Sequence, residues 1–296
     1  MEGYKAPQKD ALFVMNELLG FEKHYADLGF EDASPDMVEA IFSEAAKFSE
    51  NVLAPLNAVG DEEGCTWENS VVTTPTGFKD AYQQYVEGGW PSMTHPAEFG
   101  GQELPYSLSS ALGEWLSGAN HSWAMYPGLS QGCMATLEAH GTDEQKKMFL
   151  HKLVAGTWTG TMCLTESHCG SDLGMLKTKA VKNDDGSYSL TGTKIFISAG
   201  EHDMSENIVH IVIARLPDAP EGTKGISLFV VPKFNVSADG ENEDRNAVTC
   251  GSIEHKMGIK GSATCVINFD GAKGYLVGTE NRGLNCMFTF MNSARI

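Results

Sequence analysis

The sequence predicts an α+β protein: a helical N-terminal domain, then a small antiparallel β-barrel or sandwich, then the start of a C-terminal helical domain. Apolar residues recur with helical spacing up to residue 157. Short alternating stretches separated by glycine-containing turns follow, and helical spacing returns near residue 281. We expect a division into an N-terminal extension and three domains, over residues 1–33, 34–157, 158–278 and 279–296.

Start and stop signals define the helices of the first half. Ser34 followed by Pro35 is typical of a helix start, because a hydroxyl cap precedes a proline at the first helical position, and we expect Pro55 to end this helix. Thr142 and Gln145 have the spacing of a capping box for the last helix of this half. Helical spacing also predicts helices over residues 12–19, 77–87, 107–117 and 126–140.

Seven short strands are predicted in the second half, two of them joined by a turn at Asn183-Asp184-Asp185-Gly186. Residues 65–75 are expected to be an irregular connection, and residues 281–295 a helix. The strands are predicted over residues 178–182, 187–191, 194–198, 208–214, 226–231, 247–254 and 264–269.

Composition excludes several classes of protein. The net charge of −18, from 39 acidic and 21 basic residues, argues against nucleic-acid binding and against binding to anionic membranes. The seven cysteines form no Cys-x-x-Cys pair and the histidines lack metal-ligand spacing, so we expect reduced thiols, a cytoplasmic location and no metal site. There is no secretory signal and no apolar run of the roughly 20 residues that span a bilayer, so no membrane insertion is expected.

The stretch from Met162 to Asp172 lies where the helical pattern gives way to the strand pattern. It is rich in hydroxyls and small residues, so its backbone N–H groups and hydroxyls are expected to be free for a polar ligand. A cofactor with hydrogen-bonding edges and phosphates fits this composition.

Four stretches in the same order as in the acyl-CoA dehydrogenase family make the chain resemble that family over nearly its whole length. The stretch from Cys163 to Asp172 is similar to the family's first signature, and Lys194 to Gly200 to its second flavin segment. The other two are Pro96 to Gly101, with its double glycine, and His140 to Gln145. The extension and residues 255–265 resemble a long bacterial branch of the family. Resemblance within this branch implies 3-methylmercaptopropionyl-CoA, an intermediate of dimethylsulfoniopropionate breakdown, as the substrate.

The resemblance implies an FAD site. Backbone groups of Met162 and Leu164 and the backbone and hydroxyl of Thr165 would meet the pyrimidine edge of the isoalloxazine, and Gly170 and Ser171 would approach the pyrophosphate. In the second segment Phe196, Ile197 and Ser198 would line the ring, with Phe196 packed against it and Ser198 on the N5 side. Ser171, Asn292 and Arg295 would contact the CoA thioester.

Simpler interpretations exist for the same residues. Thr165 and Ser171 could merely satisfy the backbone of a loop, and Phe196 between two isoleucines could be a core strand residue. Asn292 and Arg295 could form a surface contact. Glu166 and Asp172 are expected to pin the loop rather than act as acid–base catalysts, while His168 departs from the small residue common in the family.

The resemblance also implies what lies outside the chain. The catalytic glutamate is expected beyond Ile296, so the chain is interpreted as the N-terminal half of a homo-oligomeric enzyme that passes electrons to an electron-transfer flavoprotein or a similar acceptor. Three alternatives stay open: an acyl-CoA oxidase that uses dioxygen, a non-catalytic chain that binds a partner, and a distant relative of flavoproteins that bind DNA.

Overall fold

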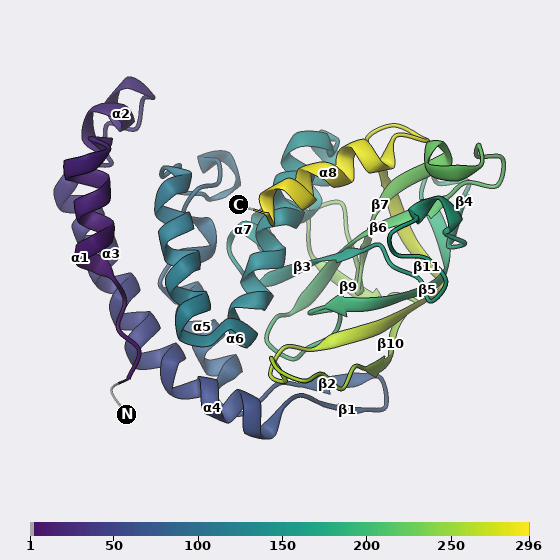
Figure 1. Ribbon diagram of the computed structural model, residues 1–296. Coiled ribbons are helices and arrows are strands. Elements are labelled where there is room, and N and C mark those ends of the chain that lie inside the picture. The colour runs from purple at the N-terminus through teal and green to yellow at the C-terminus, as the bar shows by residue number, and fades with distance from the viewer. Residues whose placement is uncertain (1–2, 296) are drawn as a thin grey trace.

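The computed structural model describes residues 3–295, with helices in the first half and a β-domain in the second (Figure 1). A last helix, α8 (Gly283–Ser293), packs on both the long helix of the first half and a strand of the β-domain. The fold class predicted from the sequence is confirmed. The finer division at residues 33, 157 and 278 stays a prediction.

Local capping explains the helix starts. α3 (Pro35–Phe48) begins where the Ser34 hydroxyl accepts a hydrogen bond from the Met37 N–H, as predicted. Pro55 does not end the helical run, which corrects the expectation. The run continues through a π-helical turn (Ser49–Leu53) into α4 (Ala54–Glu63), and Pro55 lies at the junction of the two.

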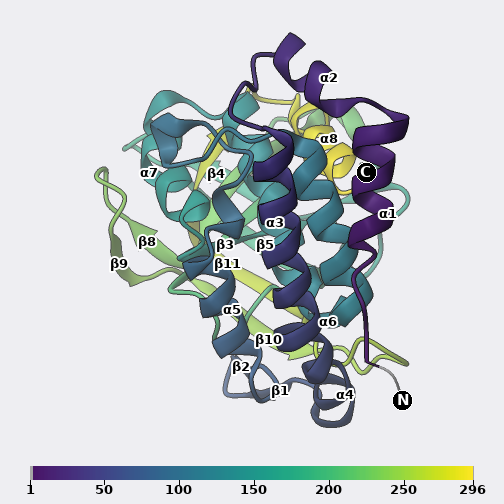
Figure 2. The same cartoon turned by 90° about the vertical axis from the view of Figure 1, so that its left-hand side faces the viewer.

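The two helices predicted around residue 120 are one element, α6 (Tyr106–His140), kinked at Asn120. The Asn120 Oδ1 accepts hydrogen bonds from the Trp123 N–H and the Ser122 hydroxyl, so the side chain caps the second half of α6 internally. The predicted capping box of α7 (Asp143–Val154) is confirmed, with Thr142 and Gln145 bonding each other's backbone N–H. Figure 2 shows α1, α3 and α6 side by side. The remaining α-helices are α1 (Gln8–Leu12), α2 (Phe21–Asp27) and α5 (Phe78–Glu87).

The main sheet has seven strands, and five of them close into a ring. The order is β10-β11-β5-β4-β6-β3, and β7 pairs with both β11 and β6, which closes the barrel. Most pairs are antiparallel as predicted, but β3 runs parallel to β6. The strands are β3 (Trp158–Cys163), β4 (Lys179–Lys182), β5 (Tyr188–Ser198), β6 (Asn207–Arg215), β7 (Ile226–Pro232), β10 (Val248–Ile253) and β11 (Thr264–Val277).

Three strand predictions need correction. Residues 187–191 and 194–198 are not separate strands, because β5 runs through both. The expected connection 65–75 contains a hairpin, β1 (Thr66–Glu68) and β2 (Val71–Thr73), fixed to the barrel where the Trp67 Nε1–H donates to the Cys250 carbonyl at 2.9 Å. A further hairpin, β8 (Phe234–Val236) and β9 (Asn242–Arg245), was not predicted.

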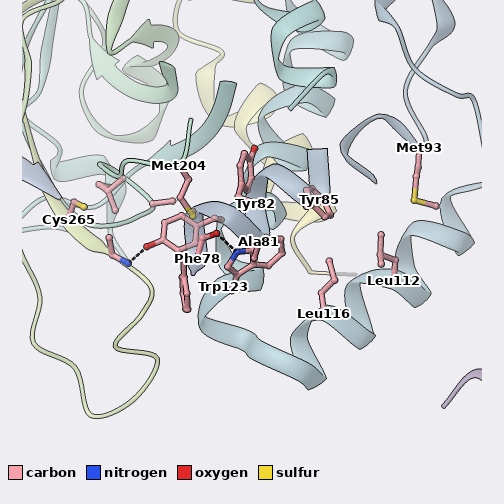
Figure 3. Packing of buried hydrophobic residues seen from close by; sticks show 14 of the residues in the cluster. Phe78, Ala81, Tyr82, Tyr85, Met93, Leu112, Leu116, Trp123, Met204 and Cys265 are labelled. Carbon is pink, nitrogen blue, oxygen red and sulfur yellow. Dashed lines mark hydrogen bonds between the residues drawn. The ribbon is translucent and has the colours of Figure 1, made fainter. Parts of the chain in front are cut away.

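The helical half and the β-domain share two clusters of buried hydrophobic residues, and both clusters contain residues from each half. Figure 3 shows Phe78, Tyr82 and Trp123 near Met204 and Cys265 of the β-domain. The Tyr126 hydroxyl of α6 accepts a hydrogen bond from the Ala263 N–H at 2.9 Å, which ties the helix to the loop before β11. Since α6 is fixed on the barrel in this way, the end of β3 has a defined position beside it.

Two expectations from composition can be compared with residues 3–295. All seven cysteines are free thiols there, as predicted. Among the described helices, none is both long enough and apolar enough to cross a bilayer.

Candidate functional site

The polar stretch singled out in the sequence leaves the barrel at the end of β3. We call residues 164–172 the site loop. Its centre is a tight turn in which Glu166 and Cys169 exchange backbone hydrogen bonds of 2.8 and 3.0 Å. Ser167 and His168 form the exposed tip of this turn. The strand before it is anchored to α6, because the Gly160 N–H donates to the Ser130 hydroxyl at 3.0 Å.

Glu166 fixes the site loop to the segment that follows it and to β5. Its buried carboxylate accepts hydrogen bonds from the Lys177 N–H (2.7 Å) and from both the N–H (3.0 Å) and the hydroxyl (2.6 Å) of Thr178. The Lys194 ammonium, whose side chain has no exposed surface, lies 2.8 Å from the Glu166 Oε1. A buried ion pair is stable only when hydrogen bonds satisfy its remaining atoms, and these contacts meet that condition. The prediction that Glu166 pins the loop is in agreement with this geometry.

Lys194 joins the two sequence segments that the family resemblance had linked. Its Nζ also donates to the Leu164 carbonyl at 3.0 Å, and the neighbouring Ile195 N–H donates to the Thr165 carbonyl at 2.9 Å. The site loop and the end of β5 are therefore bonded side by side, although they are about 30 residues apart in the chain.

A bulge in β5 turns Phe196 outward. The pairing with β11 shifts between Cys265 and Ile267, opposite this part of β5. Phe196 has a left-handed backbone (φ 58°) and 58% of its surface is exposed, whereas Lys194 and Ile197 on either side are buried. The alternative interpretation of Phe196 as a core residue is wrong, because the extra residue of the bulge breaks the inward–outward alternation.

The contacts between Glu166 and Lys194 favour the ionised form of both side chains. Burial raises the pKa of Glu166, but the Lys194 ammonium and the hydrogen bonds from Thr178 and Lys177 outweigh it and bring the pKa down to about 2. Burial lowers the pKa of Lys194, and the Glu166 carboxylate opposes that change. Glu166 is therefore the counter-charge of Lys194, and with a pKa of about 2 its carboxylate is a weak proton acceptor.

The predicted cofactor residues lie in two groups. Met162, Leu164, Thr165 and Ser198 are half-buried, while Gly170, Ser171 and Phe196 are exposed. Ile197 has only 2% of its surface exposed, so it can offer a ligand only its backbone. All of these residues are on the site loop, the last strand residues before it, or the bulged end of β5.

Two predicted CoA residues, Asn292 in α8 and Arg295 just after it, are not part of this group in residues 3–295. Asn292 and Arg295 are exposed, and the Arg295 Nη1 donates to the Asn292 Oδ1 at 3.4 Å. Their assignment to the CoA part stays a prediction.

Sequence reasoning missed three features that shape the loop. The buried Lys194 stood out only as a lysine in an apolar strand pattern. His168, left without an explanation, has its Nε2 3.1 Å from the Met175 carbonyl and so ties the turn to the following segment. Arg215 donates to the carbonyls of Leu176 and Pro220, at 3.1 and 2.9 Å, and no sequence signal indicated it.

Glu166, His168 and Cys169 also bring three possible metal-ligand atoms within 4.8 Å of one another. The carboxylate oxygens of Glu166 already accept hydrogen bonds from Lys177, Thr178 and Lys194. The arrangement is that of a pinned turn, and we assign no metal to it.

Comparison with known proteins identifies the family. The model described as "Acyl-CoA dehydrogenase, N-terminal domain" matches residues 35–157, and "Acyl-CoA dehydrogenase, middle domain" matches residues 161–272. The chain belongs to the acyl-CoA dehydrogenase family. The family inferred from the four sequence stretches is thereby confirmed.

Individual relatives and solved structures of acyl-CoA dehydrogenases support the same family assignment. The 3-methylmercaptopropionyl-CoA dehydrogenase of Ruegeria pomeroyi is 46% identical over 292 residues, covering 99% of this chain and 50% of that protein. The structure of butyryl-CoA dehydrogenase from Megasphaera elsdenii aligns with a TM-score of 0.72 at 26% identity, over 88% of this chain and 63% of that one. An acyl-CoA dehydrogenase from Bacillus anthracis complexed with FAD aligns with a TM-score of 0.71 at 25% identity, over 90% and 41%. The chain spans about half the length of the curated relatives it matches.

Proposed function

We propose that the protein is an FAD-dependent acyl-CoA dehydrogenase, which oxidises the Cα–Cβ bond of an acyl-CoA thioester. The observation that carries this proposal is the bonding of the site loop to the bulged end of β5 through Lys194 and Ile195. This bonding brings the backbone of Thr165 next to Ile195, the residue that precedes the exposed Phe196.

The groups on this surface fit a flavin. Among residues 3–295, the hydroxyls of Thr165, Ser171 and Ser198 make no hydrogen bond, so they are free to bond a ligand. A Cβ atom added to Gly170 would meet only the side chain of Thr165, at 3.4 Å, which leaves the other side of this backbone open. Free hydroxyls, an accessible glycine backbone and an exposed aromatic face suit a cofactor with a flat ring and phosphates.

In this proposal each predicted residue has a role. Thr165, with the backbone of Met162 and Leu164, bonds the pyrimidine edge of the flavin, where negative charge gathers on reduction. The pyrophosphate is held by Gly170 and Ser171. At the end of β5, Phe196 packs on the ring with the backbone of Ile197 and with Ser198 beside it. FAD, when bound, supplies the acceptor for the hydrogen that leaves the substrate's β-carbon as hydride.

The proton at the α-carbon needs a base, and the two acids of the site loop do not qualify. Glu166 is buried beneath the loop in its contact with Lys194. Asp172 accepts a hydrogen bond from the Gly174 N–H at 3.0 Å and caps the short turn there. We therefore propose that the base is a carboxylate outside residues 1–296, as the family resemblance implies.

For the substrate we propose 3-methylmercaptopropionyl-CoA, because the relative from Ruegeria pomeroyi bears that name and is 46% identical. Ser171, Asn292 and Arg295 are the proposed contacts to the CoA part. We further propose an electron-transfer flavoprotein as acceptor, a homo-oligomer and a cytoplasmic location.

The test uses the protein as expressed from its gene. Released flavin should be FAD in stoichiometric amount, and an electron-accepting dye should be reduced only when a saturated acyl-CoA is added. The ratio kcat/KM should be higher for 3-methylmercaptopropionyl-CoA than for butyryl-CoA. A protein without flavin would refute the function. Equal or reversed ratios would refute only the substrate, and hydrogen peroxide formed in step with enoyl-CoA would show an oxidase instead.

A further inference from the structure

We infer that the buried Lys194 ammonium raises the reduction potential of the bound flavin, acting through the Leu164–Thr165 peptide group. This inference rests on the proposed function, since it concerns the flavin that Thr165 is proposed to bind. Lys194 does not touch the cofactor in this account. It is a positioning residue that acts through the backbone.

The first observation is the orientation of one peptide group. Its carbonyl, that of Leu164, accepts a hydrogen bond from the Lys194 Nζ at 3.0 Å. Its N–H belongs to Thr165 and donates to no acceptor within residues 3–295. One end of the peptide therefore faces a cation inside the protein, and the other end faces the proposed ring edge.

The second observation is the burial of the cation. The Lys194 side chain has no exposed surface, so water does not screen its charge as it would at the surface. A cation at a carbonyl oxygen polarises the whole peptide and makes its N–H a stronger donor. A reduced flavin carries more negative charge at the pyrimidine edge than an oxidised one, so the polarised N–H stabilises the reduced form more.

Glu166, the counter-charge of Lys194, allows a test that distinguishes an electrostatic role of Lys194 from a purely structural one. Glu166 lies 2.8 Å from the same Nζ and offsets part of its field. Removing the cation should therefore lower the potential, and removing the carboxylate should raise it. If the pair only held the loop in shape, both changes would loosen the same loop and would not move the potential in opposite directions.

The experiment measures the reduction potential of the flavin-loaded protein by equilibration with a redox dye of known potential. At a fixed ratio of reduced to oxidised dye, Lys194→Met should lower the ratio of reduced to oxidised flavin at least tenfold. For a two-electron couple this corresponds to a reduction potential about 30 mV lower. Glu166→Gln should raise that ratio by a similar factor at a pH low enough to keep Lys194 protonated, because the carboxylate no longer opposes the lowering of the Lys194 pKa by burial. Lys194→Gln removes the charge but keeps a hydrogen-bond donor for the Leu164 carbonyl, and it serves as the second variant if the methionine variant does not fold.

The matched control is Lys177→Met, which removes one positive charge from an exposed side chain and keeps the backbone N–H that bonds the same carboxylate. It should change the ratio less than threefold, because solvent screens an exposed charge. The inference is overturned if the Lys194 and Glu166 variants fail to shift the ratio in opposite directions. If the unaltered protein binds no flavin, the proposed function fails and the inference fails with it.

Discussion

Breaking the buried pair between Lys194 and Glu166 should destabilise the β-domain strongly. We consider Lys194→Met, which removes the cation but keeps a long apolar side chain, and Glu166→Gln, which keeps the shape of the carboxylate. The double variant replaces the ion pair with two neutral groups. The four proteins form a double-mutant cycle that isolates the interaction between the two side chains.

The structure sets the magnitude. At the Nζ–Oε1 distance of 2.8 Å, two unit charges in a medium of effective dielectric constant 20 attract each other by about 6 kcal/mol. Desolvation of both groups offsets much of this attraction. Removing one partner leaves the other charge buried, and such changes cost about 3–5 kcal/mol. We expect a loss of this size for Lys194→Met. The double variant should lose at least about 2 kcal/mol less unfolding free energy than the two single variants lose together.

The assay is denaturant unfolding at neutral pH, followed by fluorescence and by circular dichroism. The control is Lys147→Met, which breaks an exposed pair with Asp239 at 3.2 Å and should cost less than about 0.5 kcal/mol. If Lys194→Met destabilises the protein no more than the control, or if the single losses simply add, the charge interaction contributes little and the reasoning is wrong.

Three further predictions concern the same region. The folded-state pKa of Glu166, about 2, lies below the ordinary 4.5, so its contribution is complete above pH 4.5 and is lost as the pH falls toward 2. The advantage of the wild type over Glu166→Gln in unfolding free energy should therefore shrink over that range in denaturant titrations. Gly192→Ala places a Cβ 2.8 Å from the Thr178 Cα and should destabilise the protein by about 2 kcal/mol or more. Gly113→Ala, in contrast, has open space around it in α6 and should stabilise the protein by about 0.5–1 kcal/mol. Thermal unfolding of both variants tests this. Phe196→Ala should change the unfolding free energy by less than about 0.5 kcal/mol, because the ring is exposed. The same variant should retain less flavin on gel filtration, and unchanged retention would contradict the proposed role of Phe196.

Several features of this protein follow from short-range chemistry and were predictable from the sequence. The cap at Ser34 and the capping box at Thr142 depend on side chains and N–H groups three residues apart. The family itself was recognisable from the site loop and the end of β5. The role of Glu166 as a loop pin was expected only because the family resemblance places the catalytic base elsewhere, and its bonds to Lys177 and Thr178 reach 11 and 12 residues along the chain.

Only the tertiary structure decided how the site is assembled. Lys194 and Glu166 are 28 residues apart, and nothing local indicates that their side chains meet in the core. The outward direction of Phe196 depends on a shift of register against β11, a strand some 70 residues further along the chain. The parallel pairing of β3 with β6 was likewise invisible in sequence. Local signals report bonds between near neighbours, whereas burial and register depend on which distant strands pair, and folding alone determines that pairing.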